Sequence, residues 1–176
     1  MGHIESFVAG ENHAYAMGDA GEAYNANLTI RRAERHIHAV WKVDVSPYVL
    51  WVDDIEADGG QHRYALMLHT AEGNRFEWNG SCITIHGRQH LLDIHLITTA
   101  PESIHLASYG QHPRLHIEQT CERARFVMLL HPRRNGDEPA EFSAQLSQDA
   151  ITAEVRLSGK TAEHVFDTRE RQQTFS

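Results

Sequence analysis

The sequence predicts an all-β protein, an antiparallel β-sandwich of jelly-roll type with about a dozen short strands. Three observations support this fold class. Apolar and polar residues alternate with a period of two along most of the chain after residue 28. Turn-forming glycine, asparagine and aspartate residues separate these alternating runs. No segment carries the long amphipathic pattern of an α-helix.

The first 27 residues lack a clear period. They are rich in small residues, and Gly10, Gly18 and Gly21 interrupt them, so we expect an N-terminal arm or loop over 1–27 with one short strand at most. The remaining residues, 28–176, are expected to form one β-sandwich domain. A chain of 176 residues favours a single domain and is long enough to bury a substantial core.

The segment 35–45 shows the alternation most clearly. It predicts a strand with Ile37, Ala39 and Trp41 on the buried face, and with His36 and His38 on the exposed face. The following segment, 48–55, is almost continuously apolar, which predicts a strand covered on both faces. It ends in two adjacent aspartates, 53 and 54, whose side chains must point to opposite faces. The simplest interpretation is that one of them caps a turn.

Turn signals define the remaining strands. Asp58-Gly59-Gly60 predicts a hairpin that joins 48–55 to a strand over 62–70. Two similar signals precede short strands at 75–78 and 81–86. Further strands are predicted at 90–98, 103–109, 113–119, 123–131, 140–146, 150–157 and 162–168, with an exposed loop at 133–139.

Composition excludes several classes of protein. The formal net charge of −8 argues against a nucleic-acid partner, which would need a basic face. No apolar stretch reaches the roughly 20 residues that span a bilayer, so we expect no membrane insertion. The opening lacks a signal-peptide pattern, which indicates a cytoplasmic protein or a mature piece of a longer one. Cys82 and Cys121 allow one disulfide but form neither a disulfide scaffold nor a cysteine-rich zinc site.

Fourteen histidines are the compositional oddity of the chain. Within several predicted strands they alternate with buried apolar residues, so they are expected to share one polar sheet face. The members of this expected face are Thr84, His86, Asp93, His95, His105, Arg114, His116 and Glu118. The pattern leaves three interpretations open: an ordinary solvated face, a surface that contacts saccharide or another domain, or a metal site.

His69 differs from the other histidines because it ends the apolar run YALML. We expect it to be partly buried at the rim of the sheet, either as a satisfied core histidine or as a ligand. His36 and His38 have the spacing of metal-binding double-stranded barrels, but no glutamate follows them at the usual distance. The sequence contains no GxSxG elbow, no glycine-rich phosphate loop and no HExxH motif.

Four segments together resemble a known family. They are GDAGEAYN (18–25), the arginine-led strand 31–45, SPYVLWVDDIEADGGQHRYALMLHT (46–70) and ITTAPES (97–103). In this order they are similar to the C-terminal β-sandwich of heparinase II/III-type polysaccharide lyases. The resemblance covers roughly residues 14–132, and its VDDI and LHT segments carry most of it.

The resemblance implies a function for the whole protein. Family enzymes cleave uronate-containing polysaccharides, such as alginate or heparin-like glycosaminoglycans, by β-elimination. Their principal acid and base residues lie in an upstream helical domain that this sequence does not contain. The chain is therefore expected to be a catalytically silent accessory domain of a bacterial lyase. The expected location is periplasmic or secreted as part of a larger protein, with the cytoplasm as the alternative.

The resemblance also implies a metal. Some family members hold a structural zinc through two histidines and an aspartate. His69 matches the rim histidine of the family's LHT strand, and Asp93 and His116 continue the His–Asp–His order. His86 and His95 compete for the same role. Zinc held by His69, Asp93 and His116 is thus the expected cofactor.

The expected partners are an acidic polysaccharide and the upstream helical domain. Positive and imidazole-bearing residues would contact the polysaccharide, and the candidates are Arg35, His36, His38, His95 and His105. Two other functions compete with the accessory domain. One is a stand-alone carbohydrate-binding module with an exposed aromatic platform from Trp51, Trp78 or Tyr109. The other is a small histidine-rich metalloenzyme of jelly-roll type.

Overall fold

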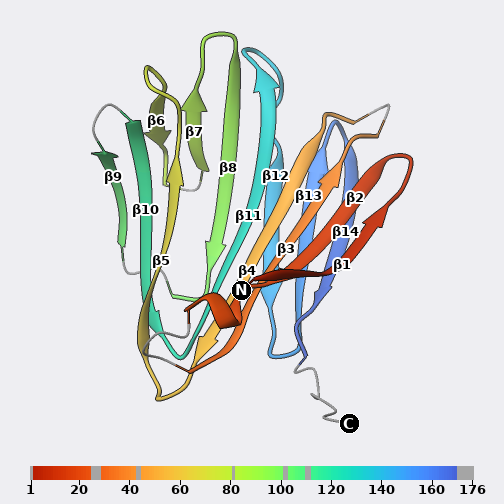
Figure 1. The fold of residues 1–176 in the computed structure, drawn as a ribbon. Coiled ribbons are helices and arrows are strands. Elements are labelled where there is room, and N and C mark those ends of the chain that lie inside the picture. Colours follow the sequence, from red (N-terminus) through yellow and green to blue (C-terminus); the bar gives the residue numbers. More distant parts are fainter. Residues whose placement is uncertain are drawn as a thin grey trace.

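The computed structural model describes residues 2–24, 29–42, 45–80, 82–100, 103–109 and 112–169. Within these ranges the chain forms fourteen strands, one short 3-10 turn, η1 (Gly21–Tyr24), and no α-helix. The predicted all-β antiparallel sandwich is confirmed (Figure 1). No helix of the described part is long and apolar enough to cross a membrane.

The strand bounds follow the predicted order closely from β4 onward. The strands are β1 (His3–Ala9), β2 (His13–Asp19), β3 (Ile30–Val40), β4 (Tyr48–Ala57), β5 (His62–His69), β6 (Arg75–Trp78), β7 (Cys82–His86), β8 (His90–Thr98), β9 (Ser103–Tyr109), β10 (His112–Cys121), β11 (Arg123–Arg134), β12 (Glu141–Leu146), β13 (Ala150–Leu157) and β14 (Lys160–Asp167).

The described residues form three sheets. The central sheet has eight strands in the order β1-β2-β3-β4-β11-β8-β7-β6, and two smaller sheets have the orders β5-β10-β9 and β12-β13-β14. One core cluster joins Leu115 of the β5–β10–β9 sheet to Phe126 of the central sheet. The other joins Ile151 of the β12–β13–β14 sheet to Leu50 and Val127 of the central sheet. Because Phe126 and Val127 are consecutive in β11, the small sheets cover opposite faces of the central one (Figure 1).

The two covering sheets are offset from each other. The core under the β5–β10–β9 sheet involves β4, β11, β8, β7 and β6, and it does not include β1, β2 or β3. The core under the β12–β13–β14 sheet extends instead to Val40 of β3 and Tyr15 of β2. One face of the β1–β2–β3 part of the central sheet therefore has no covering sheet in the described structure.

The N-terminal residues differ from the predicted arm or loop. β1 and β2 form an antiparallel hairpin that extends the central sheet past β3. Its inner strand alternates the small residues Ala14, Ala16 and Gly18 with Tyr15 and Met17. Small side chains give a weak period-two signal, which explains why sequence patterning missed the hairpin.

The alternation predicted for β3 is present, but its two faces are exchanged. His36 is only 3% exposed because the histidine face lies under the β12–β13–β14 sheet, near Phe166. Trp41, just past the strand and predicted to be buried, is 44% exposed, and Ile37 is only partly buried. The offset of the covering sheets decides this result, because burial depends on which face has a partner sheet rather than on polarity alone.

Asp54 organises a buried ionic network at the end of β4. Its side chain is fully buried and accepts from Nε of Arg123 at 2.7 Å and from Nε of Arg125 at 3.4 Å. Nη1 of Arg32 lies 3.6 Å from its Oδ2. Asp54 is therefore not the turn cap that the sequence suggested. It is the shared counter-ion of three arginines from β3 and β11.

The same arginines tie the central sheet to the β12–β13–β14 sheet. Arg125 donates to the carbonyl of Gln148 at 2.9 Å, in the loop between β12 and β13. Arg123 donates to the carbonyl of Thr168 at 3.1 Å, just after β14. Burial lowers the pKa of Arg125 below its ordinary value, and the carboxylate of Asp54 opposes that shift. The network depends on this carboxylate, since the guanidinium groups repel one another without it.

We predict that Asp54→Asn destabilises the fold by about 3–5 kcal/mol, because it leaves the buried guanidinium of Arg125 without a carboxylate partner and weakens the pairing of Arg32 and Arg123. Asp53→Asn is the matched control, since Asp53 points to the other face and pairs with Arg35, whose side chain is half exposed. The loss of stability in Asp53→Asn should be clearly smaller than in Asp54→Asn. Urea denaturation followed by fluorescence measures both. Equal losses in the two variants would contradict the central role of Asp54.

Candidate functional site on the outer face of the β5–β10–β9 sheet

The β5–β10–β9 sheet presents one face to the core and one to the outside. Leu115 and Ile117 of β10 are completely buried against the central sheet. The alternate residues of β10 therefore point outward, and nothing in the described structure packs over them. Register places Met67 of β5, His116 of β10 and His105 of β9 side by side in one row across this outer face.

Arg114 lies in the next row, opposite His69 of β5. Its Nη1 contacts the Met67 sulfur at 4.0 Å, and its Nε is buried without a hydrogen-bond acceptor. Among the described residues, no carboxylate lies within ion-pair distance of this guanidinium. An arginine in this state keeps most of its capacity to bind an oxyanion.

Glu118 supplies the one described carboxylate on this face. Its Oε1 lies 3.3 Å from Nε2 of His116 and 3.9 Å from Nη1 of Arg63. In the register it stands opposite Ala65, two rows from Arg114. The face therefore changes in charge along β10, from an unpaired guanidinium at one end to a partly neutralised carboxylate at the other.

The single histidine face predicted from the sequence is divided between two sheets. His105, Arg114, His116 and Glu118 do share the outer face just described, as the alternation predicted. Four other members lie on β7 and β8 of the central sheet and point to the side that faces the β12–β13–β14 sheet. They are Thr84, His86, Asp93 and His95. The prediction of one common face was wrong because β9 and β10 fold over the central sheet rather than continuing it.

The three expected zinc ligands do not converge. His69 and His116 lie on the outer face of the β5–β10–β9 sheet, and His69 is exposed rather than partly buried. Asp93 lies beyond the intervening core, on the far side of the central sheet. Its carboxylate accepts from Thr84 Oγ1 at 2.8 Å and is paired with Arg133. These residues do not fit a single zinc site, and the described part of the chain contains no group of three ligating side chains placed for a metal.

Asp93 has a further buried neighbour that sequence analysis missed. His131 of β11 stands opposite it in the register, and both of its ring nitrogens are buried without a hydrogen-bond partner. Burial lowers the pKa of His131 below its ordinary value. His95, proposed to bind substrate, lies on the same side, where it packs against the ring of Phe142. Burial lowers its pKa as well.

His36 and His38 are not at a substrate surface either. Both lie between the central sheet and β14. Tyr15 Oη is 2.8 Å from Nδ1 of His36, and Nδ1 of His38 is 3.2 Å from Nδ1 of His164. Tyr48 Oη in turn lies 2.9 Å from Nε2 of His164. Sequence analysis did not single out His164. The alternation within β14, which puts His164 on the same face as the buried Phe166, is the signal that would have identified it.

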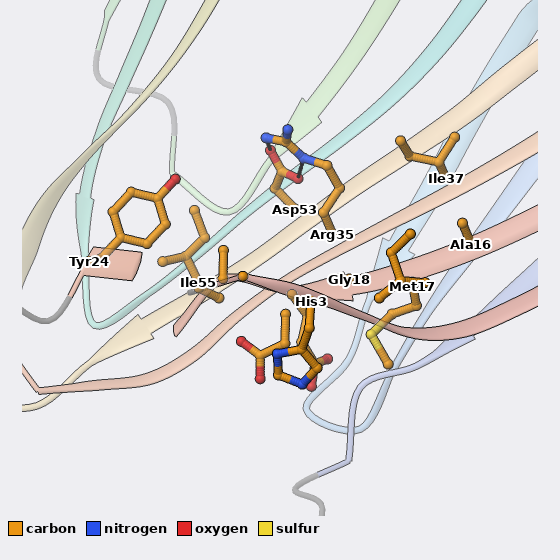
Figure 2. A pocket seen from close by; sticks show the side chains of 15 residues that line it. His3, Ala16, Met17, Gly18, Tyr24, Arg35, Ile37, Asp53 and Ile55 are labelled. Carbon is orange, nitrogen blue, oxygen red and sulfur yellow. Dashed lines mark hydrogen bonds and ion pairs between the residues drawn. The ribbon is translucent and has the colours of Figure 1, made fainter. Parts of the chain in front are cut away.

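Arg35, the remaining proposed substrate contact, lies on the uncovered face of the central sheet. It donates to both oxygens of Asp53, at 2.7 and 2.8 Å, and stacks over the ring of Trp51. This hydrogen bonding raises the pKa of Arg35. In Figure 2, Arg35 and Ile37 project to one side of the strands and Met17 to the other.

A cavity of about 410 Å³ adjoins Arg35 on this face. Apolar or small residues from β1, β2, β3 and η1 make up most of its wall. They include Ile4, Ala16, Gly18, Tyr24 and Ile37. The cavity is thus a largely apolar depression with one ion pair at its edge, unlike the imidazole-rich outer face of the β5–β10–β9 sheet.

Comparisons with known proteins match the chain to solved structures only. No family model and no curated protein matches it. Heparinase III superimposes with a TM-score of 0.64 at 13% identity, over 94% of this chain and 27% of that protein. Heparan sulfate lyase HepC from Pedobacter heparinus superimposes with a TM-score of 0.60 at 12% identity, over 97% of this chain and 28% of that one. The chain thus spans about a quarter of their length, and the likeness shows a shared fold.

Buried histidines make the stability of the fold depend on pH. Burial lowers the pKa of His164 from 6.5 to about 4 and also lowers that of His38. Below about pH 6.5 the unfolded chain therefore binds protons that the folded chain refuses. We predict that the free energy of unfolding falls as pH decreases from 7 to 4, with His164 contributing on the order of 2–3 kcal/mol.

Chemical denaturation at a series of pH values measures this dependence. His164→Gln should flatten the slope between pH 7 and 4, because an amide does not titrate there. His90→Gln, a change at an exposed histidine of β8, is the matched control and should leave the slope unchanged. A slope that is identical in all three proteins would refute the role of His164.

Proposed function

We propose that this chain is an accessory β domain of a polysaccharide lyase that acts on acidic, uronate-containing glycans by β-elimination. In this proposal a helical catalytic domain supplies the acid and base, and the chain supports that domain and borders its substrate. The likeness to heparinase III over nearly the whole chain, but only 27% of that protein, supports such a division. A periplasmic or secreted location belongs to the same proposal.

The observation that carries the proposal is the uncovered face of the central sheet. Its apolar residues follow the same period as the covered part of the sheet, so the surface continues the core without a partner layer. Phe7 is 66% exposed and stands beside Ala16, which in turn stands beside Ile37. A contiguous apolar face of this kind is typical of an interface rather than of a free surface.

The shape of this face suits a helix. Along β2 the residues on this side are Ala14, Ala16 and Gly18, which leave a shallow trough between the larger side chains of β1 and β3. Strands two positions apart in a sheet are separated by about 10 Å, which matches the diameter of an α-helix. Arg35 and Asp53 place one ion pair at the edge of the trough.

The uncovered face also lies on the side of the central sheet that the β5–β10–β9 sheet occupies. A domain docked over β1–β3 would therefore stand next to the outer face that carries Arg114 and its histidines. A glycan chain in the space between them would contact both. This arrangement gives the β domain a place at the substrate without any catalytic residue of its own.

A stand-alone carbohydrate-binding module is the second candidate, and one observation favours it. Trp78 at the end of β6 is 46% exposed. Trp51 does not extend that aromatic surface, because Arg35 covers its ring, and the side chain of Tyr109 lies outside the described residues. Trp41, just past β3, is also exposed, but four strands of the central sheet separate β3 from β6. The two tryptophans therefore do not form a row of aromatic rings, which is the stronger binding platform.

The proposal predicts that the isolated chain does not cleave alginate or heparan sulfate. The measurement is the ultraviolet absorbance of the unsaturated product over several hours, with a complete polysaccharide lyase as the positive control. Turnover by the purified chain that persists through independent preparations would overturn the accessory role. It would favour instead an active site within the β domain.

The uncovered face yields a second prediction. Ile37→Ser should change the free energy of unfolding by less than about 1 kcal/mol and reduce the binding of a hydrophobic dye. Val52→Ser, on the opposite and covered face of the adjacent strand, should cost about 3 kcal/mol or more. Denaturation and dye fluorescence measure the two effects. A similar loss of stability in both variants would show that β1–β3 is covered on both faces.

A further inference from the structure

We propose that Arg114, with His69, His105 and His116 around it, forms an oxyanion-binding subsite for a carboxylate or sulfate group of an acidic glycan. The glycan as the source of the oxyanion rests on the proposed function, whereas the subsite rests on the geometry of the outer face. No part of the subsite belongs to the uncovered face of β1–β3.

The state of Arg114 is the first argument. Other buried or half-buried arginines of the described structure each have a carboxylate partner. Arg35 pairs with Asp53, Arg123 with Asp54 and Arg133 with Asp93. Arg114 has none among the described residues, and its one described polar contact is to a methionine sulfur, a weak acceptor. A planar guanidinium without a counter-ion binds carboxylate or sulfate through paired N–H donors.

The neighbours of Arg114 are the second argument. His69 stands directly across from it on β5, and His116 lies two residues further along β10 on the same face. His105 stands across from His116 on β9. Imidazole nitrogens at these positions donate to oxyanions and exchange hydrogen bonds with sugar hydroxyls. Cross-strand neighbours lie about 5 Å apart, so one ligand group can contact several of them.

The apolar contact at the same place is the third argument. Met67 is 50% exposed on β5, beside His116 in the same row and in contact with Arg114 through its sulfur. A flexible thioether can pack against the apolar C–H face of a sugar ring while the polar side chains around it bind the hydroxyl and acidic groups of that sugar. The outer face therefore combines a cation, hydrogen-bond donors and an apolar contact, which is what a charged sugar requires.

Local positive charge distinguishes this subsite from the rest of an acidic protein. The net charge of −8 repels a polyanion at long range, so attraction must come from a local excess of positive charge. Glu118 is the one described carboxylate on the face, and His116 and Arg63 partly neutralise it. The end of β10 that carries Arg114 is thus the position where an anionic group is least opposed.

Binding of three probes to the isolated chain tests the subsite. Alginate oligosaccharides carry carboxylates, heparin oligosaccharides carry sulfates as well, and a neutral glucan oligosaccharide carries neither. Isothermal titration calorimetry at low salt should detect one or both acidic probes and not the glucan. Arg114→Gln should weaken the binding of an acidic probe by at least about tenfold.

The matched control is Arg156→Gln, an equal change in charge at an exposed arginine on β13, away from the outer face. It should leave affinity within about twofold. Equal weakening by both substitutions, binding of the neutral glucan with the same affinity, or no binding of either acidic probe would overturn the subsite. Circular dichroism confirms that each variant is folded. These results leave the accessory role intact, because that role fails only if the chain alone cleaves glycan.

Discussion

The offset between the two covering sheets is the constraint on which the rest of the structure depends. Each three-stranded sheet covers only part of the eight-stranded one, and the two parts overlap mainly at β4, β11 and β8. Those strands are consequently buried on both faces, as the consecutive residues Phe126 and Val127 of β11 show. At β2 and β3 one face is packed and the other is free, whereas β1 is exposed on both faces. The histidines of β3 fall on the packed face, and its isoleucine and alanine fall on the free one.

This offset also explains which features of the fold the sequence could predict and which it could not. The strands from β4 onward were predicted because alternation, apolar runs and glycine-containing turns are local properties. The face on which a strand is buried is not local. His36 and Ile37 were assigned to the wrong sides because polarity usually reports burial, and here a neighbouring layer overrides it. The hairpin of β1 and β2 escaped notice because alanine and glycine provide little contrast in hydrophobicity.

The candidate site shows the same division between local and non-local information. Alternation correctly placed His105, Arg114 and His116 on one face, since they lie on strands that pair directly. It could not tell that β8 belongs to a different layer, so Asp93 was grouped with residues from which the core separates it. Nor does any pattern reveal that a salt bridge to Arg133 already occupies the Asp93 carboxylate. Pairing across long sequence distances decides these points.

The arginine network around Asp54 determines the C-terminal boundary of the folded domain. Arg123 donates to the main-chain carbonyl of Thr168, and Arg32 donates to that of Arg169 at 3.0 Å. These acceptors lie beyond the last strand, in a segment that an alignment of strands would treat as dispensable. In a polypeptide that ends with β14, the guanidinium groups of Arg123 and Arg32 would lose these carbonyl acceptors. Thr168 and Arg169 therefore belong to the stable structure of the domain, and a C-terminal boundary for recombinant expression belongs downstream of them.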